Sequence, residues 1–317
     1  MQDAFVFGCA LLVALAIDRW WGEPAARWHP VVWMGNYLSL AAKRLEPNPD
    51  PAVRDLKSFW LAAAYWWAGA ALIFIVACAV QWALFKLHWA IGALLLGLAL
   101  KPMLAWVMLR SEVQAVEASL GQSLGAGRSR LAMLVSRDTA NLSETEVRES
   151  AIESLAENLN DSVVAPVFWF VLFGLPGAAV YRFANTADAM WGYRGLRNGV
   201  NWEWAGKWAA WADDVLSWLP ARITALLLAL VTGAVNLKNL RSQARKTPSP
   251  NSGWPMAAMA LALGVRLQKR GMYALNPSGR PPKPPDTALA QKIALKVLLA
   301  LILWAQAAII LIAYLKS

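Results

Sequence analysis

Apolar stretches typical of membrane helices recur along this chain, and polar connections separate them. They lie at residues 4–17, 59–85, 88–109, 163–183, 223–237 and 293–315. A helix needs about 20 residues to cross about 30 Å of hydrocarbon. The pattern therefore predicts an all-α integral membrane protein with about 5–7 membrane segments. One of them, 163–183, is predicted to be a broken or re-entrant span because it contains helix-breaking residues, namely Pro166, Gly174, Pro176 and Gly177.

The polar connections predict the domain organisation and the orientation. We expect a single polytopic membrane domain over 1–317, with a polar helical insert at 110–162 and a basic cytoplasmic loop at 238–292. Lys and Arg collect on the cytoplasmic side of membrane proteins, which places the insert on the cytoplasmic side as well. If 163–183 crosses fully, the stretch 185–222 falls on the outer side, and if 163–183 is re-entrant, that stretch stays with the insert.

Composition supports the membrane assignment and excludes several classes of function and site. Hydrophobic residues make up 58% of the 317 residues and charged residues only 16%, whereas soluble domains carry about 25% charged residues. The net charge of +10 does not indicate nucleic-acid binding, because the basic residues lie in the connections, where topology accounts for them. Two cysteines and two histidines exclude a disulfide framework and a histidine-based metal cluster.

An acidic block stands out at residues 137–161. It holds seven carboxylates and two arginines, a formal charge of 2 − 7 = −5. Ser143 and Glu146 fit a capping box, which predicts a helix that begins near Glu144. On this helix an apolar stripe recurs every four residues (Val147, Ala151, Leu155, Leu159), and so does a carboxylate ladder (Glu149, Glu153, Glu157, Asp161).

Two interpretations of the ladder follow. It is either a solvated face or a site for a hard cation, and clustered carboxylates with the amide oxygen of Asn158 suit Mg²⁺, which commonly brings nucleotide phosphates with it. Further ionisable residues lie close to apolar segments: Asp188 follows Asn185, and Asp213 and Asp214 precede Arg222. Such residues are either interfacial charges or functional candidates.

Several ordered motifs resemble the CobD/CbiB family of cobalamin biosynthesis over nearly the whole chain. They are HPV (29–31), RDT (137–139), ESLAENLNDSVVAPVFW (153–169), GLPGAAVYRFANTADAMWGYR (174–194), ADDVLSWLPAR (212–222) and SPNSGWPMAAMALALGV (249–265). The departures are small, and none removes the acidic block: Glu23 stands where Asp is usual, Ser217 where Asn is usual, and Leu261 where Gly is expected.

The resemblance implies a multi-pass enzyme of the cell inner membrane, an adenosylcobinamide(-phosphate) synthase. Such an enzyme uses ATP to join the propionate carboxylate of adenosylcobyric acid to (R)-1-amino-2-propanol or its O-phosphate. We expect ATP and Mg²⁺ as cofactors. A homo-oligomer and a complex with other cobalamin-assembly membrane enzymes both remain open.

The site residues follow from the chemistry of that reaction. Mg²⁺ must shield phosphate charge, cations must hold oxyanions, and a base must accept a proton from the amine. We expect metal ligands at Glu153, Glu157 and Asp161, and nucleotide or phosphate contacts at Arg137, Asp138, Asn158, Asn185 and Arg194. The expected catalytic residues are Asp188, Asp213, Asp214, Arg222 and His29, of which His29 has a structural role as its alternative.

Two other function classes compete with a ligase. A transporter of a corrinoid or anion would use the broken span and the charges close to the membrane. A non-catalytic scaffold for other biosynthetic enzymes would not need the carboxylate ladder.

Overall fold

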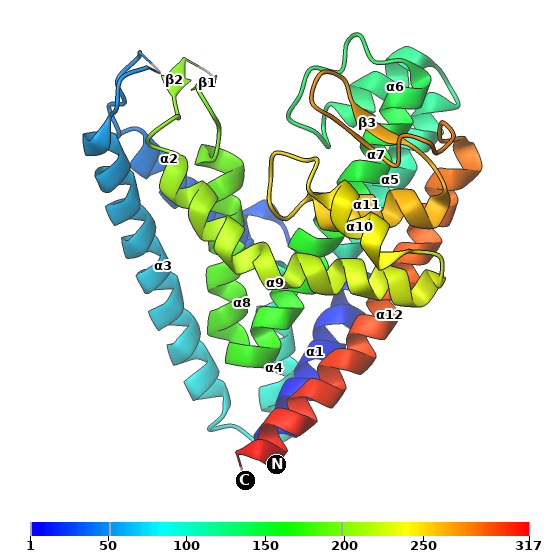
Figure 1. The fold of residues 1–317 in the computed structure, drawn as a ribbon. Helices are drawn as coiled ribbons and strands as arrows, with labels where there is room; N and C mark the ends of the chain where they lie inside the picture. The colour runs from blue at the N-terminus through cyan, green and yellow to red at the C-terminus, as the bar shows by residue number, and fades with distance from the viewer. Residues whose placement is uncertain (1, 51, 198, 317) are drawn as a thin grey trace. The chain divides into compact units, whose positions relative to one another are not determined.

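The computed structural model describes residues 2–50, 52–197 and 199–316, and nearly all of their regular structure is helical (Figure 1). Within these described residues, six helices are long and apolar enough to cross a membrane: Asp3–Trp21, Leu56–Leu84, Trp89–Leu120, Glu144–Trp191, Lys207–Thr232 and Pro284–Leu315. The predicted all-α membrane fold is therefore confirmed, and this multi-pass pattern makes the protein an integral membrane protein.

The chain divides into two compact units. Unit 1 comprises Met1–Leu104, Ala165–Leu216 and Ala305–Ser317, and unit 2 comprises Ala105–Val164 and Ser217–Trp304. Two long helices contribute to both units. Residues 207–216 of α9 (Lys207–Thr232) and 305–315 of α12 (Pro284–Leu315) belong to unit 1, and the rest of each helix belongs to unit 2.

Unit 1 is a bundle of membrane helices with one small hairpin. Its complete elements are α1 (Gln2–Trp21), the 3₁₀ turn η1 (Ala26–Trp28), α2 (Pro30–Ala42), α3 (Leu56–Leu84), α4 (Trp89–Leu100), the 3₁₀ turn η2 (Lys101–Met103), α8 (Ala165–Trp191) and the antiparallel strands β1 (Leu196–Arg197) and β2 (Val200–Asn201).

Small residues let the helices of unit 1 pack closely. Gly97 of α4 lies against α1, so that an added Cβ would be 2.6 Å from Val13 Cγ1 and 2.8 Å from the Ala10 carbonyl oxygen. Close backbone approach at small residues is the usual way in which membrane helices associate. The pair Lys101-Pro102 inside the predicted span 88–109 indicates a kink from the sequence alone, and η2 does interrupt the helix there.

The predicted break in 163–183 occurs at Gly174 in α8. This residue has φ 69° and ψ −154°, a conformation that is essentially restricted to glycine. The backbone N–H of Leu175 loses its helical partner and donates instead to Gln81 Oε1 of α3 over 2.8 Å. A side chain from a neighbouring helix thus satisfies the freed backbone group, as the apolar environment requires.

The chain reverses direction at this break. An added Cβ at Gly177 would lie 3.2 Å from the carbonyl carbon of Trp169. In a continuous helix, eight residues would separate these positions by about 12 Å along the axis. α8 is therefore a helical hairpin whose second limb returns beside the first. Of the two interpretations left open by the sequence, the re-entrant one agrees with this geometry.

Unit 2 surrounds one central helix with shorter elements. Its helices are α5 (Trp106–Leu120), α6 (Leu124–Leu131), α7 (Glu144–Leu159), α10 (Leu237–Ala244) and α11 (Gly253–Leu263), and a π-helical turn η3 (Asn160–Val164) follows α7. The strands β3 (Leu267–Lys269) and β4 (Tyr273–Leu275) form an antiparallel hairpin. α5, α6, α11 and β3 all pack against α7.

One predicted span boundary was wrong. The span predicted at 223–237 is part of α9, which begins at Lys207 and ends at Thr232. Pro220 lies inside this helix, where the hydroxyl of Thr224 donates to the carbonyl of Pro220 over 2.9 Å. Within the segment 238–292 the chain forms α10, α11, the β3–β4 hairpin and the start of α12, and its cytoplasmic location stays a prediction.

Candidate functional site

Helix α7 begins where the capping box predicts. The Ser143 backbone N–H donates to Glu146 Oε2 over 2.8 Å, and the Glu146 N–H donates to Ser143 Oγ over 3.4 Å. The predicted apolar stripe is buried over its full length, with every member at 1% exposure or less: Val147, Ala151, Leu155 and Leu159. The capping box sets where α7 begins and the stripe sets which face is buried, and together they determine the position of the carboxylate ladder.

The ladder is not a solvated face. Glu149 is 1% exposed and Glu153 is 5% exposed, while Glu157 and Asp161 are half-buried. Burying several like charges on one helix face costs free energy unless they have partners. The interpretation of this face as an ordinary charged surface is therefore wrong.

Arginines from outside the helix balance the buried carboxylates. Arg266, beside β3, places its Nε 3.5 Å from Glu149 Oε1, and Arg137 places Nη2 3.7 Å from Glu153 Oε2. Arg270, in the turn of the β3–β4 hairpin, pairs with Glu146. These partners lie far from α7 in the sequence, except Arg137. They supply the counter-charge that the helix itself lacks.

One carboxylate oxygen of Glu153 lies outside its ion pair with Arg137. Its Oε1 is buried and has no hydrogen-bond partner in the described parts of the chain. The Tyr273 hydroxyl of β4 interacts with the carboxylate of Glu153, and burial together with the charges of Glu153 and Glu157 raises the pKa of Tyr273 well above its ordinary value. A neutral phenol and two carboxylates thus converge on one place.

This donor set fits a magnesium ion that also binds phosphate. Within 2–50, 52–197 and 199–316, no three His, Cys, Asp or Glu side chains form a metal-binding group. Mg²⁺ is usually held by one or two carboxylates plus substrate phosphates, and the unpaired oxygen of Glu153 meets that need. Asp161 lies in the π-helical turn, which changes the periodicity of the ladder after Glu157. The three-carboxylate set stays a prediction.

Residues flanking the ladder have local structural partners. Arg137 also donates to Ser150 Oγ of α7. Asp138 is exposed, and its Oδ1 accepts the Ala140 N–H over 2.9 Å, which stabilises the turn before α7. The Asn158 amide group donates to the Ser154 carbonyl over 3.0 Å, so its oxygen is the atom that can face a cation.

A second group of predicted residues gathers in unit 1. The Asn185 amide of α8 donates to Asp213 Oδ1 of α9 over 3.4 Å. Arg194 lies close enough to the neighbouring Asp214 to interact electrostatically. The structure therefore brings together four predicted residues from α8, α9 and the segment between them. Asp188 lies on the same face of α8 as Asn185 because the two are three positions apart.

The structure places Arg222 and His29 in different surroundings. Arg222 lies in unit 2 and donates to Asn251 Oδ1 over 2.6 Å. His29 is the N-cap of α2: its Nδ1 accepts the Val31 N–H over 3.2 Å, and its Nε2 lies 3.1 Å from Glu23 Oε2. Since Nδ1 is an acceptor here, Nε2 carries the proton and donates to Glu23. His29 therefore has a structural role, and any contact with substrate stays a prediction.

A buried ion cluster lies next to His29 that the sequence pattern did not predict. Lys101 Nζ lies 2.6 Å from Glu23 Oε2 and 3.2 Å from Asp18 Oδ1, with Lys101 3% and Asp18 1% exposed. Lys101 is the only charged residue in the predicted span 88–109. An ionisable residue within an apolar span marks a functional candidate, so the sequence does carry a signal for Lys101 beyond the kink at Pro102.

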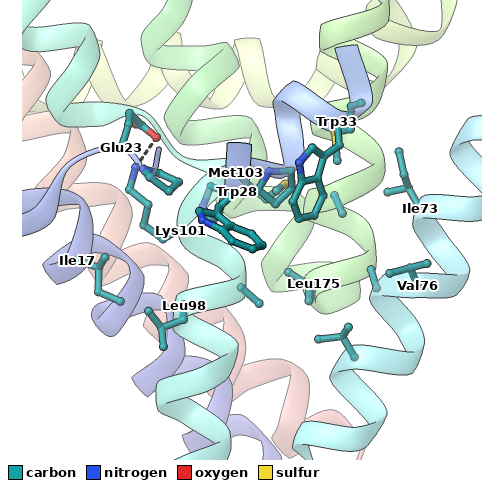
Figure 2. Close-up of a pocket in the computed structure, with 18 of the residues that line it drawn as sticks. Ile17, Glu23, Trp28, Trp33, Ile73, Val76, Leu98, Lys101, Met103 and Leu175 are labelled. Atoms are coloured by element: carbon teal, nitrogen blue, oxygen red, sulfur yellow. Dashed lines mark ion pairs between the residues drawn. The ribbon is translucent and has the colours of Figure 1, made fainter. Parts of the chain in front are cut away.

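This cluster borders an apolar cavity of about 810 Å³ in unit 1. Figure 2 shows Glu23 and Lys101 at one side of the cavity, Trp28 and Trp33 extending into its centre, and aliphatic side chains such as Leu98 on the walls. Ligand pockets commonly measure about 300–1,000 Å³ and combine apolar walls with a few polar groups. The sequence gives no indication of this cavity, because its walls come from five separate helices.

Comparisons with known proteins agree with one another. A family model described as CobD/Cbib protein matches residues 11–301. "Probable cobalamin biosynthesis protein CobD" of Pyrococcus abyssi is 40% identical over 287 residues, covering 90% of this chain and 89% of that protein. The protein of the same name from Methanothermobacter thermautotrophicus is 38% identical over 275 residues, covering 84% and 85%.

A bacterial relative shows similar identity. "Cobalamin biosynthesis protein CobD" of Chromobacterium violaceum is 39% identical over 277 residues and covers 86% of this chain and 85% of its own length. No solved structure matches this chain.

Proposed function

This chain belongs to the CobD/CbiB family of cobalamin biosynthesis, and we propose that it is an ATP-dependent amide ligase of the cell inner membrane. Its reaction joins the propionate carboxylate of adenosylcobyric acid to the amine of (R)-1-amino-2-propanol or of its O-phosphate. The products are adenosylcobinamide or its phosphate.

The reaction needs an activated acyl group. A carboxylate is a poor electrophile, so its oxygen first attacks the terminal phosphorus of ATP, and ADP leaves with the electrons of the broken P–O bond. The amine then attacks the carbonyl carbon of the acyl phosphate, an amide C–N bond forms, and phosphate departs with the C–O bonding electrons. The attacking amine must lose a proton, and a carboxylate side chain can accept it.

The observation that carries the proposal is the buried ladder of α7, with the unpaired Oε1 of Glu153 and its surrounding arginines. Glu153 and Glu157 would hold Mg²⁺, with Asn158 and Asp161 assisting. The metal, when bound, shields phosphate charge. Arg137 would hold a phosphate oxyanion, because a guanidinium binds such groups through two parallel hydrogen bonds.

The proton acceptor is a separate assignment. We propose that Asp188, Asp213 or Asp214 accepts the proton of the amine, and that Arg194 binds a phosphate oxygen. The contacts of Asn185 with Asp213 and of Arg194 with Asp214 support this group as a candidate, because both hold the carboxylates in fixed positions.

An assay with purified protein tests the ligase. Adenosylcobyric acid, the amino alcohol or its phosphate, ATP and Mg²⁺ are supplied, and amide product and ADP are quantified. We expect Glu153→Gln and Glu157→Gln to lower the rate about 100-fold or more. Glu144→Gln is the matched control, because Glu144 lies on the same helix with 59% of its side chain exposed. If folded wild-type protein forms no amide and consumes no ATP, the assignment fails.

A transporter is the second candidate function. It is favoured by the hairpin of α8, because broken helices with partnered backbone groups build substrate sites in many transporters. Uptake of labelled corrinoid into proteoliposomes distinguishes the two. Transport without ATP consumption, unaffected by Glu153→Gln, would favour the transporter over the ligase.

A further inference from the structure

A cavity of about 650 Å³ in unit 2 is rich in arginine. It lies where α9, the end of α10 and the segment before α11 meet, and Arg222, Arg241 and Arg245 all line it. Its lining residues include no Asp or Glu, and the two large aromatic side chains are Trp218 and Trp254. Three guanidinium groups without a carboxylate give this cavity a formal charge of +3, which complements an anion.

The guanidinium of Arg222 is held rigidly. Its Nη1 donates to the Trp218 carbonyl and to Asn251 Oδ1, both over 2.6 Å, and its Nη2 donates to the Pro250 carbonyl over 3.1 Å. The Trp218 and Trp254 ring centroids lie 4.4 Å and 4.9 Å from its Cζ. Of five N–H donors, these contacts use three, which leaves the Nε–H and one N–H of Nη2.

The other two arginines add positive charge at the C-terminal end of α10, where the helix dipole favours cations. Arg241 and Arg245 are exposed and lie one helical turn apart at the end of α10, an arrangement in which like charges repel. In the described chain segments, no ion pair involves either of them. A bound anion would remove this repulsion.

The segment before α11 is also fixed. Ser249 Oγ accepts the backbone N–H groups of Asn251 and Ser252, both over 3.2 Å, and the Thr247 hydroxyl donates to the Ser249 carbonyl over 2.9 Å. The 11-residue helix α11 starts directly after this turn, so the positive end of its dipole lies at the cavity. The negative end of α10 lies at the same cavity, so the attraction for an anion comes from the three arginines, and the turn keeps the backbone around them fixed.

We propose that this cavity binds a phosphate group. Guanidinium groups are the side chains best suited to phosphate because their planar fork matches its oxygens. The phosphate belongs either to a soluble phosphate compound or to a lipid headgroup. The proposal extends the proposed function, since a ligase of this kind would have phosphate-bearing substrates, but it concerns binding and is measured without catalysis.

The test is calorimetric titration of the detergent-solubilised full chain with sodium phosphate and with ATP, without Mg²⁺, at constant ionic strength. We expect the double variant Arg241→Gln/Arg245→Gln to bind phosphate about tenfold or more weakly than wild type. Lys246→Gln is the matched control: Lys246 is exposed and next to Arg245, and it bonds to Gln243 and not to the cavity. Its affinity should stay within about twofold of wild type.

A second arm identifies the source of the phosphate. Native mass spectrometry measures retention of phosphatidic acid against phosphatidylcholine in wild type and in the double variant. If the double variant loses ATP binding and Lys246→Gln does not, the proposal is supported and the phosphate belongs to a soluble compound. If instead only the double variant loses retention of phosphatidic acid, the proposal is supported and the phosphate belongs to a lipid headgroup. Equal binding by the double variant and Lys246→Gln, or no preference for phosphate over chloride, overturns it. Because no step requires turnover, a failed ligase assay leaves this result unaffected.

Discussion

The position of α7 depends on Arg148, and its removal gives the sharpest test of how unit 2 is stabilised. The guanidinium is only 5% exposed. Its Nε lies 3.0 Å and 2.9 Å from the two carboxylate oxygens of Glu117 on α5, and its Nη2 lies 2.7 Å from Glu144 Oε1. Thr287 of α12 donates to the same Glu117 over 2.7 Å. Three helices of unit 2 therefore meet at one ion network.

The two carboxylate partners of Arg148 differ in burial, and this difference sets how much unfolding free energy each substitution should cost. Removing one partner of a buried pair costs about 3–5 kcal/mol, because the other charge stays buried without compensation. Glu117 retains 22% exposure, so we expect the lower end, about 3 kcal/mol, for Arg148→Met. Glu144 is 59% exposed, and Glu144→Gln should cost about 0.5 kcal/mol or less.

The measurement is reversible unfolding in a titration with sodium dodecyl sulfate, followed by far-ultraviolet circular dichroism. The double variant Arg148→Met/Glu117→Leu separates an unpaired charge from lost packing. Since it removes the residual charge, it should be clearly more stable than Arg148→Met alone. Equal stabilities for Arg148→Met and Glu144→Gln would refute the burial argument. A double variant less stable than Arg148→Met would refute the role of the residual charge.

Three further predictions concern α8, β4 and the nucleotide. In the same titration, Gly174→Ala should lower the free energy of unfolding by about 2–3 kcal/mol, because its φ is positive and a Cβ would meet the Gln81 amide. The control Gly233→Ala, also at positive φ but with nothing nearby, should cost only about 1 kcal/mol. Equal costs for the two variants would contradict this prediction. The folded-state pKa of Tyr273 lies above the unfolded value of about 10, so the stability that Tyr273 contributes is present below pH 10 and is lost as the pH rises further. Between pH 9 and 11 the free energy of unfolding should therefore fall less steeply in Tyr273→Phe than in wild type. An unchanged slope would count against the raised pKa of Tyr273. Mg²⁺-ATP should raise the melting temperature of wild type but not of Glu153→Gln, and equal shifts would remove Glu153 from the metal site.

Local patterns predicted α7 well because the interactions that define it are local. The capping box joins residues three positions apart, and the apolar stripe repeats with the helical period, so both can be recognised in the sequence. The same holds for Gly174, where the residue type indicates a break. The direction of the chain after the break could not be predicted, because it depends on a contact with Gln81, 94 positions away.

The partners of the ladder could not be predicted for the same reason. Arg266 reaches Glu149 across 117 positions, and no periodic pattern links the two. The helical part of α9 before Pro220 was also missed, since Asp213 and Asp214 break its apolar run although the backbone remains helical. Charged residues within an apolar helix hide that helix from a search for uncharged spans.

The composition of unit 1 from three separate stretches has a consequence for biosynthesis. Gln306 Nε2 of α12 donates to the Gly8 carbonyl of α1 over 3.0 Å, although 298 positions separate them in the sequence. At about 5–20 residues per second, the ribosome makes the second partner about 15–60 s after the first. All of unit 2 is synthesised within that interval, since it ends at Trp304. Helix α1 therefore completes its packing only after unit 2 has been made, and a nascent chain that stops before residue 305 leaves α1 without that partner.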